Sequence, residues 1–158
     1  MSGRDYYSSP VGELVIESEE DKITIVNFLK DSKQEELMTP VIEQCIRELE
    51  EYFFQGRKFF GVEMNPAGSS FQMKVWAELL LIPYGKTCSY EDIAVRVGDI
   101  KSIRAVGLAN GQNPLAILVP CHRVIGKNGD LVGYGGGLEN KTWLLRHEGA
   151  FPQQLSLF

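Results

Sequence analysis

The hydrophobic pattern of the chain changes its period once, at residues 65–68, and this change limits the possible folds more than any other feature. Before it, short alternating apolar runs are separated by turn residues, which is typical of strands. After it, apolar residues recur every three or four positions, which predicts helices. We therefore predict an α/β (α+β) protein. A small N-terminal β-meander-plus-helix domain covers residues 1–65, and a mostly helical C-terminal domain containing a helix-turn-helix covers residues 69–158.

The first domain is predicted to contain a meander of three strands and one helix. The helix begins at Thr39-Pro40, since threonine favours the N-cap and proline the first helical position, and it ends at Gly56. The segment Phe59–Met64 is expected to add another strand. The strands of the meander are predicted at residues 6–7, 13–17 and 23–29.

The second domain opens with a helix whose start is marked by a capping box of Ser69 and Gln72. Further helices are predicted at residues 89–97, 102–110 and 138–147. The first two of these are short and surround a tight turn, which outlines a helix-turn-helix. The apolar run Leu115–Val119 predicts a buried strand, and Asn128-Gly129 predicts the turn of a hairpin.

Charge is unevenly distributed along this chain of 158 residues, whose net charge is −5. Residues 1–65 hold 7 Lys/Arg against 14 Asp/Glu, whereas residues 101–158 hold 6 against 3. A basic C-terminal third is compatible with a polyanionic partner, and equally with scatter in a small sample.

Cysteine usage and hydropathy argue against several classes of protein. Three cysteines are an odd number without metal-ligand spacing, so we expect a reducing compartment, no disulfide framework and no bound metal. No apolar stretch approaches the roughly 20 residues of a membrane span, and residues 1–10 are too polar for a signal peptide. We therefore expect a cytoplasmic protein that does not bind membranes.

Cys121 is the strongest candidate for chemistry. It follows Pro120 and precedes His122 and Arg123, whose positive charge would favour a thiolate. Neighbouring side chains on an extended chain point to opposite sides. Cys121 and His122 can therefore cooperate only if the chain turns there or if a water relays the proton. A buried structural cysteine beside an unrelated histidine is the alternative.

Four other residues are weaker candidates by themselves. Glu148 follows the last predicted helix, where the helix dipole disfavours a carboxylate. It is either a solvated side chain or a buried partner of a histidine. The simplest interpretation of Tyr90 is a packing residue, that of Asn113 is a turn residue, and that of Arg104 is a surface cation.

Together these residues resemble one family. Residues Ser69 to Gly149 are similar to the catalytic domain of the O6-alkylguanine-DNA alkyltransferases, the methylated-DNA–protein-cysteine methyltransferases. The blocks that carry the resemblance are Pro83-Tyr84-Gly85 with Ser89-Tyr90, Arg104-Ala105-Val106-Gly107, Asn113-Pro114 with Pro120-Cys121-His122-Arg123-Val124, Gly133-Tyr134 with Gly136-Gly137-Leu138, and Trp143-Leu144-Leu145 with His147-Glu148-Gly149. The first domain is similar to the family's variable domain only in pattern. It holds one cysteine and no histidine, so no zinc is carried over.

The resemblance implies DNA repair by direct reversal in double-stranded DNA. An alkyl group would pass from O6 of guanine, or O4 of thymine, to Cys121, once and irreversibly. His122 would deprotonate Cys121 through a water, and Glu148 would hold the imidazole in the required tautomer. Asn113 would brace the site, and Tyr90 would donate to the guanine as it leaves. No cofactor is implied, and we expect a monomer located with the chromosomal DNA.

The resemblance also implies DNA contacts and a substrate pocket. Arg104 would fill the gap left by a flipped base, and the small Ala105 and Gly107 would let its helix approach the DNA backbone. The other expected DNA contacts are Ser89, Tyr90 and Arg123, and the expected pocket residues are Val124, Tyr134, Gly135, Gly136 and Ala116. Gly135 and Ala116 stand where some members carry serine and proline, which implies room for alkyl groups larger than methyl. Asn110 stands at a position that is not fixed in kind.

Two other functions remain open from the residues alone. One is a non-catalytic helix-turn-helix module that senses or regulates at DNA, which would need none of Cys121, His122, Asn113 and Glu148. The other is a thiol hydrolase that uses Cys121, His122 and Glu148. The helix-turn-helix outline and the lack of a histidine base distant in sequence disfavour the hydrolase.

Overall fold

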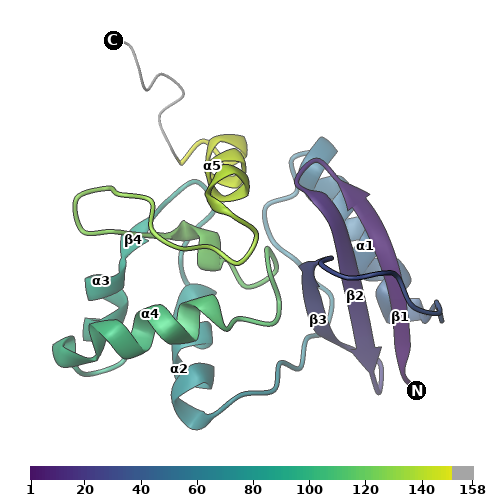
Figure 1. Ribbon diagram of the computed structural model, residues 1–158, viewed down its shortest axis with the longest axis horizontal. Helices are drawn as coiled ribbons and strands as arrows, with labels where there is room; N and C mark the ends of the chain where they lie inside the picture. Colours follow the sequence, from purple (N-terminus) through teal and green to yellow (C-terminus); the bar gives the residue numbers. More distant parts are fainter. Residues whose placement is uncertain (151–158) are drawn as a thin grey trace. The chain divides into compact units, whose positions relative to one another are not determined.

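The computed structural model describes residues 1–150 and divides the chain into two units (Figure 1). Unit 1 comprises Met1–Ala67 and the short segment Pro114–Leu118. Unit 2 comprises Gly68–Asn113 and the described residues from Val119 onward. A segment from the second half of the chain thus belongs to unit 1. The predicted single boundary at residues 65–68 would have placed this segment in the second domain. Residues 151–158 of the predicted second domain lie outside the described part.

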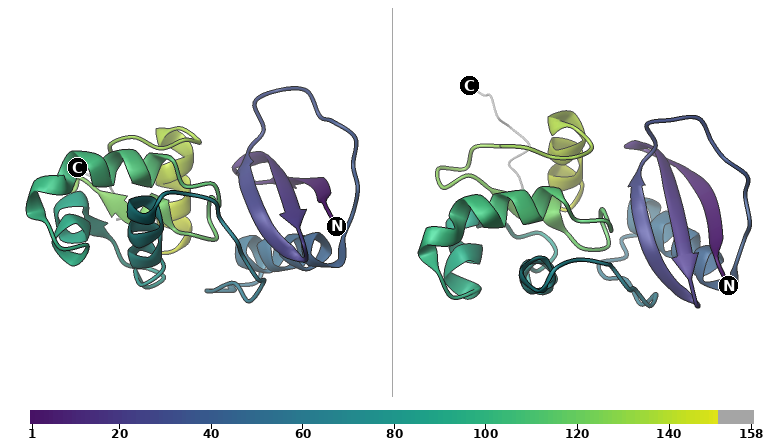
Figure 2. Two further views of the ribbon diagram at one scale, coloured as in Figure 1. Left: turned by 90° about the horizontal axis from the view of Figure 1, so that it is seen from below. Right: turned by 60° about the horizontal axis from the view of Figure 1, so that its bottom comes forward.

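Unit 1 is an antiparallel sheet with a helix along one face (Figure 2). Strands β1 (Gly3–Ser9), β2 (Gly12–Glu19) and β3 (Lys22–Phe28) lie in the order β1-β2-β3, which confirms the predicted meander. Helix α1 (Pro40–Phe54) packs against all three strands. Alternation along the strands sends every second side chain to this face. The fully buried core of unit 1 includes Leu14, Ile16, Ile23, Val26, Ile42, Cys45 and Leu49.

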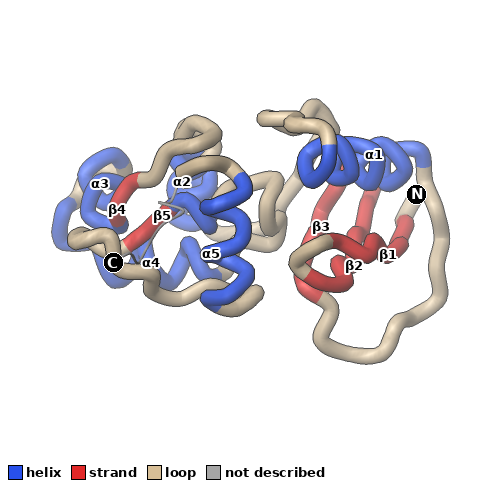
Figure 3. The backbone as a smooth tube through the Cα atoms, turned by 90° about the horizontal axis from the view of Figure 1, so that it is seen from above, coloured by secondary structure: helices blue, strands red, loops and turns tan. Residues whose placement is uncertain are grey.

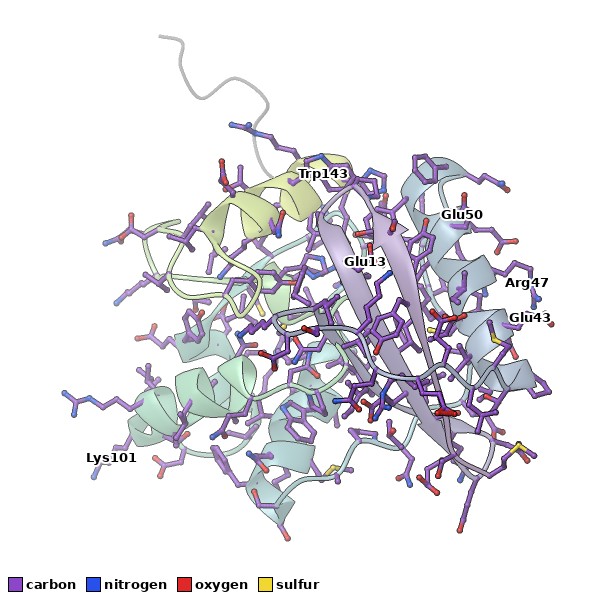
Figure 4. All side chains as sticks on the ribbon, turned by 45° about the vertical axis from the view of Figure 1, so that its right-hand side comes forward. Glu13, Glu43, Arg47, Glu50, Lys101 and Trp143 are labelled. Carbon is purple, nitrogen blue, oxygen red and sulfur yellow. The ribbon has the colours of Figure 1, made fainter. Side chains whose placement is uncertain are left out.

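Helix α1 starts at Pro40 as predicted, but Thr39 does not cap it with its side chain. The Thr39 hydroxyl instead lies 3.0 Å from that of Ser18 on β2, and both residues are buried. The hydroxyl is therefore used to tie the helix start to the sheet. On the opposite side of α1, Glu43, Arg47 and Glu50 are exposed (Figure 4).

The predicted strand over Phe59–Met64 is wrong. Only one isolated bridge, between Met64 and Ile23, joins this segment to the sheet. The N–H groups of Gly61 and Val62 donate instead to the buried carboxylate of Glu48 on α1, at 2.9 and 3.1 Å. A side chain thus satisfies the donors that a neighbouring strand would otherwise have bonded.

The predicted strand over Leu115–Val119 is also wrong. Its start makes a single bridge to β3, in which Val26 donates to Pro114 and Ala116 donates to Val26, both at 2.9 Å. Ile117 then takes a φ of +72°, a left-handed conformation that ends any extended run. The run is buried as expected, but the chain bends within it.

Unit 2 is mostly helical, as predicted. Helix α2 (Ser70–Leu79) begins with the predicted capping box of Ser69 and Gln72. A second capping box, of Ser89 and Asp92, starts α3 (Tyr90–Arg96). The turn η1 (Ile100–Ser102) leads into α4 (Ile103–Gly111), and α5 (Leu138–His147) follows later in the chain. None of the described helices has the length and apolar character needed to cross a membrane.

Helices α3 and α4 pack on each other in the predicted helix-turn-helix outline, and α2 packs on α4. The indole N–H of Trp76 on α2 donates to the carbonyl of Ala109 on α4 at 2.9 Å. This bond holds α4 in place from the side that faces the interior. Lys101 on η1, at the N-terminal approach to α4, is exposed (Figure 4).

The predicted hairpin around Asn128-Gly129 is only half present. The turn exists, since Gly126 donates to Asp130 at 2.7 Å and Gly129 has a φ of +87°. Strand β5 (Val124–Ile125) precedes it, but no described strand returns beside β5. Strand β5 pairs instead with β4 (Cys88–Ser89), in parallel (Figure 3). A strand from earlier in the chain therefore takes the place of the returning hairpin strand.

Candidate active site

The candidate site is built on a single turn of 3-10 helix, η2 (Cys121–Arg123). The Cys121 N–H donates to the Val119 carbonyl at 2.7 Å, and the Arg123 N–H donates to the Pro120 carbonyl at 3.0 Å. Successive side chains on such a turn point about 120° apart instead of to opposite sides. The chain therefore turns where cooperation between Cys121 and His122 requires it, and all three side chains of η2 are buried.

Glu148, the C-cap residue of α5, binds the two residues that follow Cys121 on this turn. Its Oε2 lies 2.8 Å from His122 Nε2, and its two oxygens accept from Arg123 Nε at 2.7 Å and Arg123 Nη2 at 3.0 Å. The third nitrogen of the guanidinium, Nη1, donates to the Ile82 carbonyl at 2.7 Å. A carboxylate stands at the end of α5 because two buried partners there outweigh the unfavourable helix dipole.

The charges of this cluster follow from its contacts. Burial alone would raise the pKa of Glu148, but the hydrogen bonds and charges of His122 and Arg123 outweigh it and lower the pKa to about 2. Burial is the largest influence on His122 and lowers its pKa below 6.5, although Glu148 opposes this. His122 is therefore neutral at pH 7 beside an ionised Glu148.

A neutral His122 facing a carboxylate with Nε2 must carry its hydrogen on that nitrogen. Its other ring nitrogen, Nδ1, is then a proton acceptor. Nδ1 is buried and has no hydrogen-bond partner among the described residues. The arrangement fixes one ring nitrogen and leaves the other free to accept a proton, on the same turn as Cys121, as a general base requires.

Cys121 itself is not the low-pKa thiol predicted from its neighbours. Burial raises the pKa of its thiol, while a hydrogen bond from Asn113 and the charge of Lys141 oppose this only in part. The prediction fails because His122 is neutral and the Arg123 charge is already paired with Glu148. A thiol at rest, deprotonated only when a base acts on it, is what this environment supports. Asn113 also donates to the Val119 carbonyl at 2.8 Å, next to the turn.

Lys141 lies near Cys121, although its sequence position did not lead us to predict it as a site residue. It is fully buried on α5, and its ammonium donates to the carbonyls of Val132 and Gly133 at 3.0 and 3.2 Å. Burial lowers its pKa to about 8, and Cys121 acts in the opposite direction. The signal was present in the spacing: residues 141, 144, 145 and 148 fall on one helical face, where a lysine is unusual.

Tyr90 is the first residue of α3, and its ring lies close to the ammonium of Lys141. The Lys141 ammonium lies 5.9 Å from the ring centroid. The Tyr90 hydroxyl donates to the Val132 carbonyl at 3.0 Å. Burial raises the pKa of Tyr90, negative charge on Cys121 once its thiol is deprotonated would raise it further, and the amide of Asn110 opposes both.

The residues expected to bind DNA divide into two groups. Arg104 and Ala105 are exposed on α4, and Gly107 lies partly buried on the same helix. The DNA contact predicted for Arg123 is corrected by the structure. Its guanidinium is buried against Glu148 and Ile82, so no face of it is available to a phosphate. The Ser89 hydroxyl accepts from the Asp92 N–H at 3.0 Å as the cap of α3.

The residues expected to line the pocket have unequal surroundings. Val124 is fully buried in β5, and burial raises the pKa of Tyr134 well above its usual value. Gly136 accepts from Asn140, whereas a Cβ at Gly135 would meet nothing within 4 Å. A larger residue at 135 therefore has room. Ala116 belongs to the segment grouped with unit 1, so its place in a pocket wall stays a prediction.

Comparison with known families covers both units. Residues 4–66 match the ribonuclease-like domain of 6-O-methylguanine DNA methyltransferase. Residues 70–150 match the DNA binding domain of 6-O-methylguanine DNA methyltransferase.

Individual relatives are similar over most of the chain. The methylated-DNA–protein-cysteine methyltransferase of Methanosarcina acetivorans is 45% identical and covers 91% of this chain and 96% of its own. The constitutive methylated-DNA–protein-cysteine methyltransferase of Bacillus subtilis is 46% identical, covering 91% and 95%. The crystal structure of Mycobacterium tuberculosis O6-methylguanine methyltransferase matches 98% of both chains with a TM-score of 0.86 and 39% identity. That of Mycobacterium tuberculosis OGT in complex with DNA matches 92% of this chain and 91% of its own, with a TM-score of 0.82 and 42% identity.

Proposed function

Because the chain belongs to the 6-O-methylguanine DNA methyltransferase family, we propose that it repairs DNA by moving an alkyl group from O6 of guanine onto Cys121. Membership of this family confirms what the resemblance of the sequence blocks indicated. One observation carries the residue assignment: Cys121 lies on one turn with His122, whose Nε2 is held by Glu148 and whose Nδ1 is unpartnered among the described residues.

The reaction begins with the proton of Cys121. His122 Nδ1 accepts it through a water, and Glu148 stabilises the imidazolium that results. The thiolate attacks the alkyl carbon in line, the S–C bond forms, and the C–O6 bond breaks with its electron pair on guanine. Tyr90 donates its hydroxyl proton, or a strong hydrogen bond, to the guanine anion. The products are an S-alkylcysteine and an unmodified guanine, and the proton that His122 took from Cys121 is released to solvent, from which Tyr90 regains its own.

The pKa values favour this order of events. A thiol with a raised pKa stays protonated until substrate and base are in place, which protects it from other electrophiles. The buried ammonium of Lys141 provides positive charge near Cys121, where negative charge passes from sulfur to the purine. We therefore add Lys141 to the proposed catalytic group.

Helix α4 is proposed to bring the protein to the DNA. The reactive O6 is inside the base stack, so the nucleotide must leave the duplex at a cost of a few kcal/mol. Arg104 is exposed on α4 and is long enough to occupy the space left behind. We place the protein with the chromosomal DNA in the cytoplasm.

The transfer is proposed to occur once per molecule. A thioether has no easy leaving group, and exchange with another thiol does not cleave it. Burial raises the pKa of Cys45 to about 12 and that of Cys88 to about 11, so both thiols are protonated at neutral pH, and neither adjoins a histidine as Cys121 does.

The test is a titration of the protein with excess duplex containing O6-methylguanine, followed by intact mass and peptide mapping. One methyl group per molecule on Cys121 is expected, with none in Cys121→Ala. Multiple turnover, or the methyl group on Cys45 or Cys88, would overturn the proposal. Hydrolysis of an ester substrate without protein alkylation would instead establish the thiol hydrolase.

A further inference from the structure

The loop that joins β5 to α5, residues 126–137, is rich in glycine and contains no helix or strand (Figure 1). Two consecutive residues of this loop, Val132 and Gly133, are exposed, yet side chains of the candidate site bind their backbone carbonyls. We call these two residues the strap. Its carbonyls accept from side chains that the proposed reaction needs, so the strap and the substrate compete for the same donors.

Two helices each send one donor to the Val132 carbonyl. The Tyr90 hydroxyl on α3 and the Lys141 ammonium on α5 both donate to it, each at 3.0 Å. The same ammonium also donates to the Gly133 carbonyl at 3.2 Å. A carbonyl oxygen has two lone pairs, so these two donors satisfy the Val132 carbonyl completely. Hydrogen bonds from a charged donor are stronger than those between neutral groups, so Lys141 holds the strap firmly.

The proposed reaction needs the Tyr90 proton in another direction. A phenol has one hydroxyl hydrogen, which can point to only one strong acceptor at a time. While this hydrogen is bonded to the Val132 carbonyl, it is not available to the guanine that leaves the alkyl group on Cys121. The hydrogen bond between Tyr90 and the strap therefore has to break before Tyr90 can act on the substrate.

We propose that the strap is an autoinhibitory latch, which occupies the donors of Tyr90 and Lys141 in the free protein and is released when the guanine enters the site. This inference rests on the proposed alkyl transfer. A buried ammonium without acceptors is unfavourable, and the two strap carbonyls supply acceptors until the substrate arrives. The guanine then replaces one acceptor by another, so the donors are paired in both states.

The backbone of the loop allows the strap to leave while the ends of the loop stay in place. Gly133 has a φ of +52°, a left-handed conformation, and a Cβ built on it would meet nothing within 4 Å. The ends of the loop have hydrogen bonds that do not involve the strap. The Gly126 N–H donates to the Asp130 carbonyl at 2.7 Å, and the Asn140 side chain donates to the Gly136 carbonyl at 2.9 Å.

The test changes how readily residue 133 takes its left-handed conformation. Gly133→Val disfavours the latched strap because valine rarely has a positive φ, whereas Gly133→Asn is of similar size and tolerates one. Free O6-methylguanine should methylate Cys121 about 5-fold faster in Gly133→Val than in the wild type, as followed by intact mass. Gly133→Asn should react at nearly the wild-type rate. A purely structural role of the strap predicts no gain in rate, because lost packing slows a reaction.

A second measurement tests the latch without changing the strap. Tyr90→Phe removes one donor to the Val132 carbonyl, so chymotrypsin should cleave the native protein after Leu131 about 3- to 10-fold faster, the effect of one lost hydrogen bond. Tyr6→Phe removes a hydroxyl that accepts from the Gln34 N–H in unit 1, and it should leave this cleavage unchanged. Peptide mapping identifies the cleaved bond.

The outcomes separate this inference from the proposed function. Equal rates in the wild type, Gly133→Val and Gly133→Asn would overturn the latch, as would a Gly133→Val variant slower than Gly133→Asn. Unchanged cleavage of Tyr90→Phe would overturn it too. If one of these results is found while duplex O6-methylguanine alkylates Cys121 of the wild type, only the latch fails. If neither the free base nor the duplex alkylates the wild type, the proposed function fails and the latch fails with it.

Discussion

Glu148 is the residue on which the geometry of the candidate site depends, because both His122 and Arg123 donate to it. Replacing it with glutamine leaves the Arg123 guanidinium buried without a counter-charge. We expect Glu148→Gln to lower the free energy of unfolding by about 3 kcal/mol, as for other broken buried ion pairs. Urea unfolding measures this. Glu43→Gln, at an exposed position on α1, should change it by less than about 0.5 kcal/mol.

The same pair should respond to acid in a defined direction. The folded pKa of Glu148 is about 2 against an ordinary 4.5, so its stabilisation is complete above pH 4.5 and is lost as the pH falls toward 2. The difference in stability between wild type and Glu148→Gln should therefore shrink over that range. A difference that stays constant would show that Glu148 is not ionised in the folded protein.

The rate of alkyl transfer should depend on pH through two residues. The pKa of His122 lies below 6.5, so the rate should stay high at pH 6.5 and fall only in more acidic solution, where the base becomes protonated. Lys141 loses its charge above its pKa of about 8, so the rate should decline there. Single-turnover rates against pH measure both limbs. Lys141→Met should remove the alkaline limb, and Lys127→Met, an exposed lysine, should keep it.

At the scale of elements, α4 combines the proposed DNA contact with a place in the candidate site. Its exposed side carries Arg104, and its buried side carries Asn110. If Arg104 stabilises the flipped state, Arg104→Ala should slow repair in duplex DNA about 10- to 100-fold, since flipping costs a few kcal/mol. Reaction with free O6-benzylguanine should not change.

The matched control for Arg104 is Lys101→Ala, which removes an exposed cation from η1 just before α4. It should weaken DNA binding without slowing the reaction at saturating protein. Equal slowing of the duplex and the free base by Arg104→Ala would show that the arginine supports the active site and not the extruded base.

Helix α5 shows how an element brings distant chemistry together. Its buried face carries Lys141 one turn from its start and ends at Glu148, with Leu144 and Leu145 between them. The two leucines pack into unit 2 and so fix where both charges lie. The capping box of Ser89 has a similar effect at the start of α3, because it sets the direction in which Tyr90 leaves the chain.

At the scale of the whole molecule, charge limits how the protein binds DNA. Residues 101–158 carry 6 Lys/Arg against 3 Asp/Glu, and one of those cations, Arg123, is internally paired. We expect few phosphates to be neutralised, so that the slope of log K against log salt is about −2 to −4. Binding measured by fluorescence anisotropy over a salt series tests this. A slope near −10 would require a basic surface that these residues do not provide.

Alkylation should lower the stability of the whole molecule. Cys121 is only 7% exposed and lies on a turn whose side chains are all buried, so an added methyl group has to displace its neighbours. Overpacking of this kind costs about 1–3 kcal/mol. The methylated protein should melt at a lower temperature than the unmodified one, and Cys121→Ala treated in the same way should not shift. An unchanged melting temperature would mean that the site has room for the alkyl group.

Much of the secondary structure followed from the sequence because it depends on neighbouring residues. The meander, the capping box at Ser69 and the α3–α4 pair were predicted from alternation, caps and helical spacing within short windows. The errors fall where a partner distant in sequence intervenes. The Glu48 carboxylate accepts hydrogen bonds from the backbone N–H groups of the segment before Met64, and β4 pairs with β5 in place of a hairpin strand.

By itself, the sequence determined the order of the meander strands and of the α-helices and identified Cys121, His122 and Glu148 as candidates, since block spacing and helix ends are local properties. Only the tertiary structure placed Arg123 inside against Glu148, raised the pKa of Cys121 and buried Lys141 beside it. These features depend on burial and on the distances between charges. Both are set by residues far apart along the chain, which no short window of sequence contains.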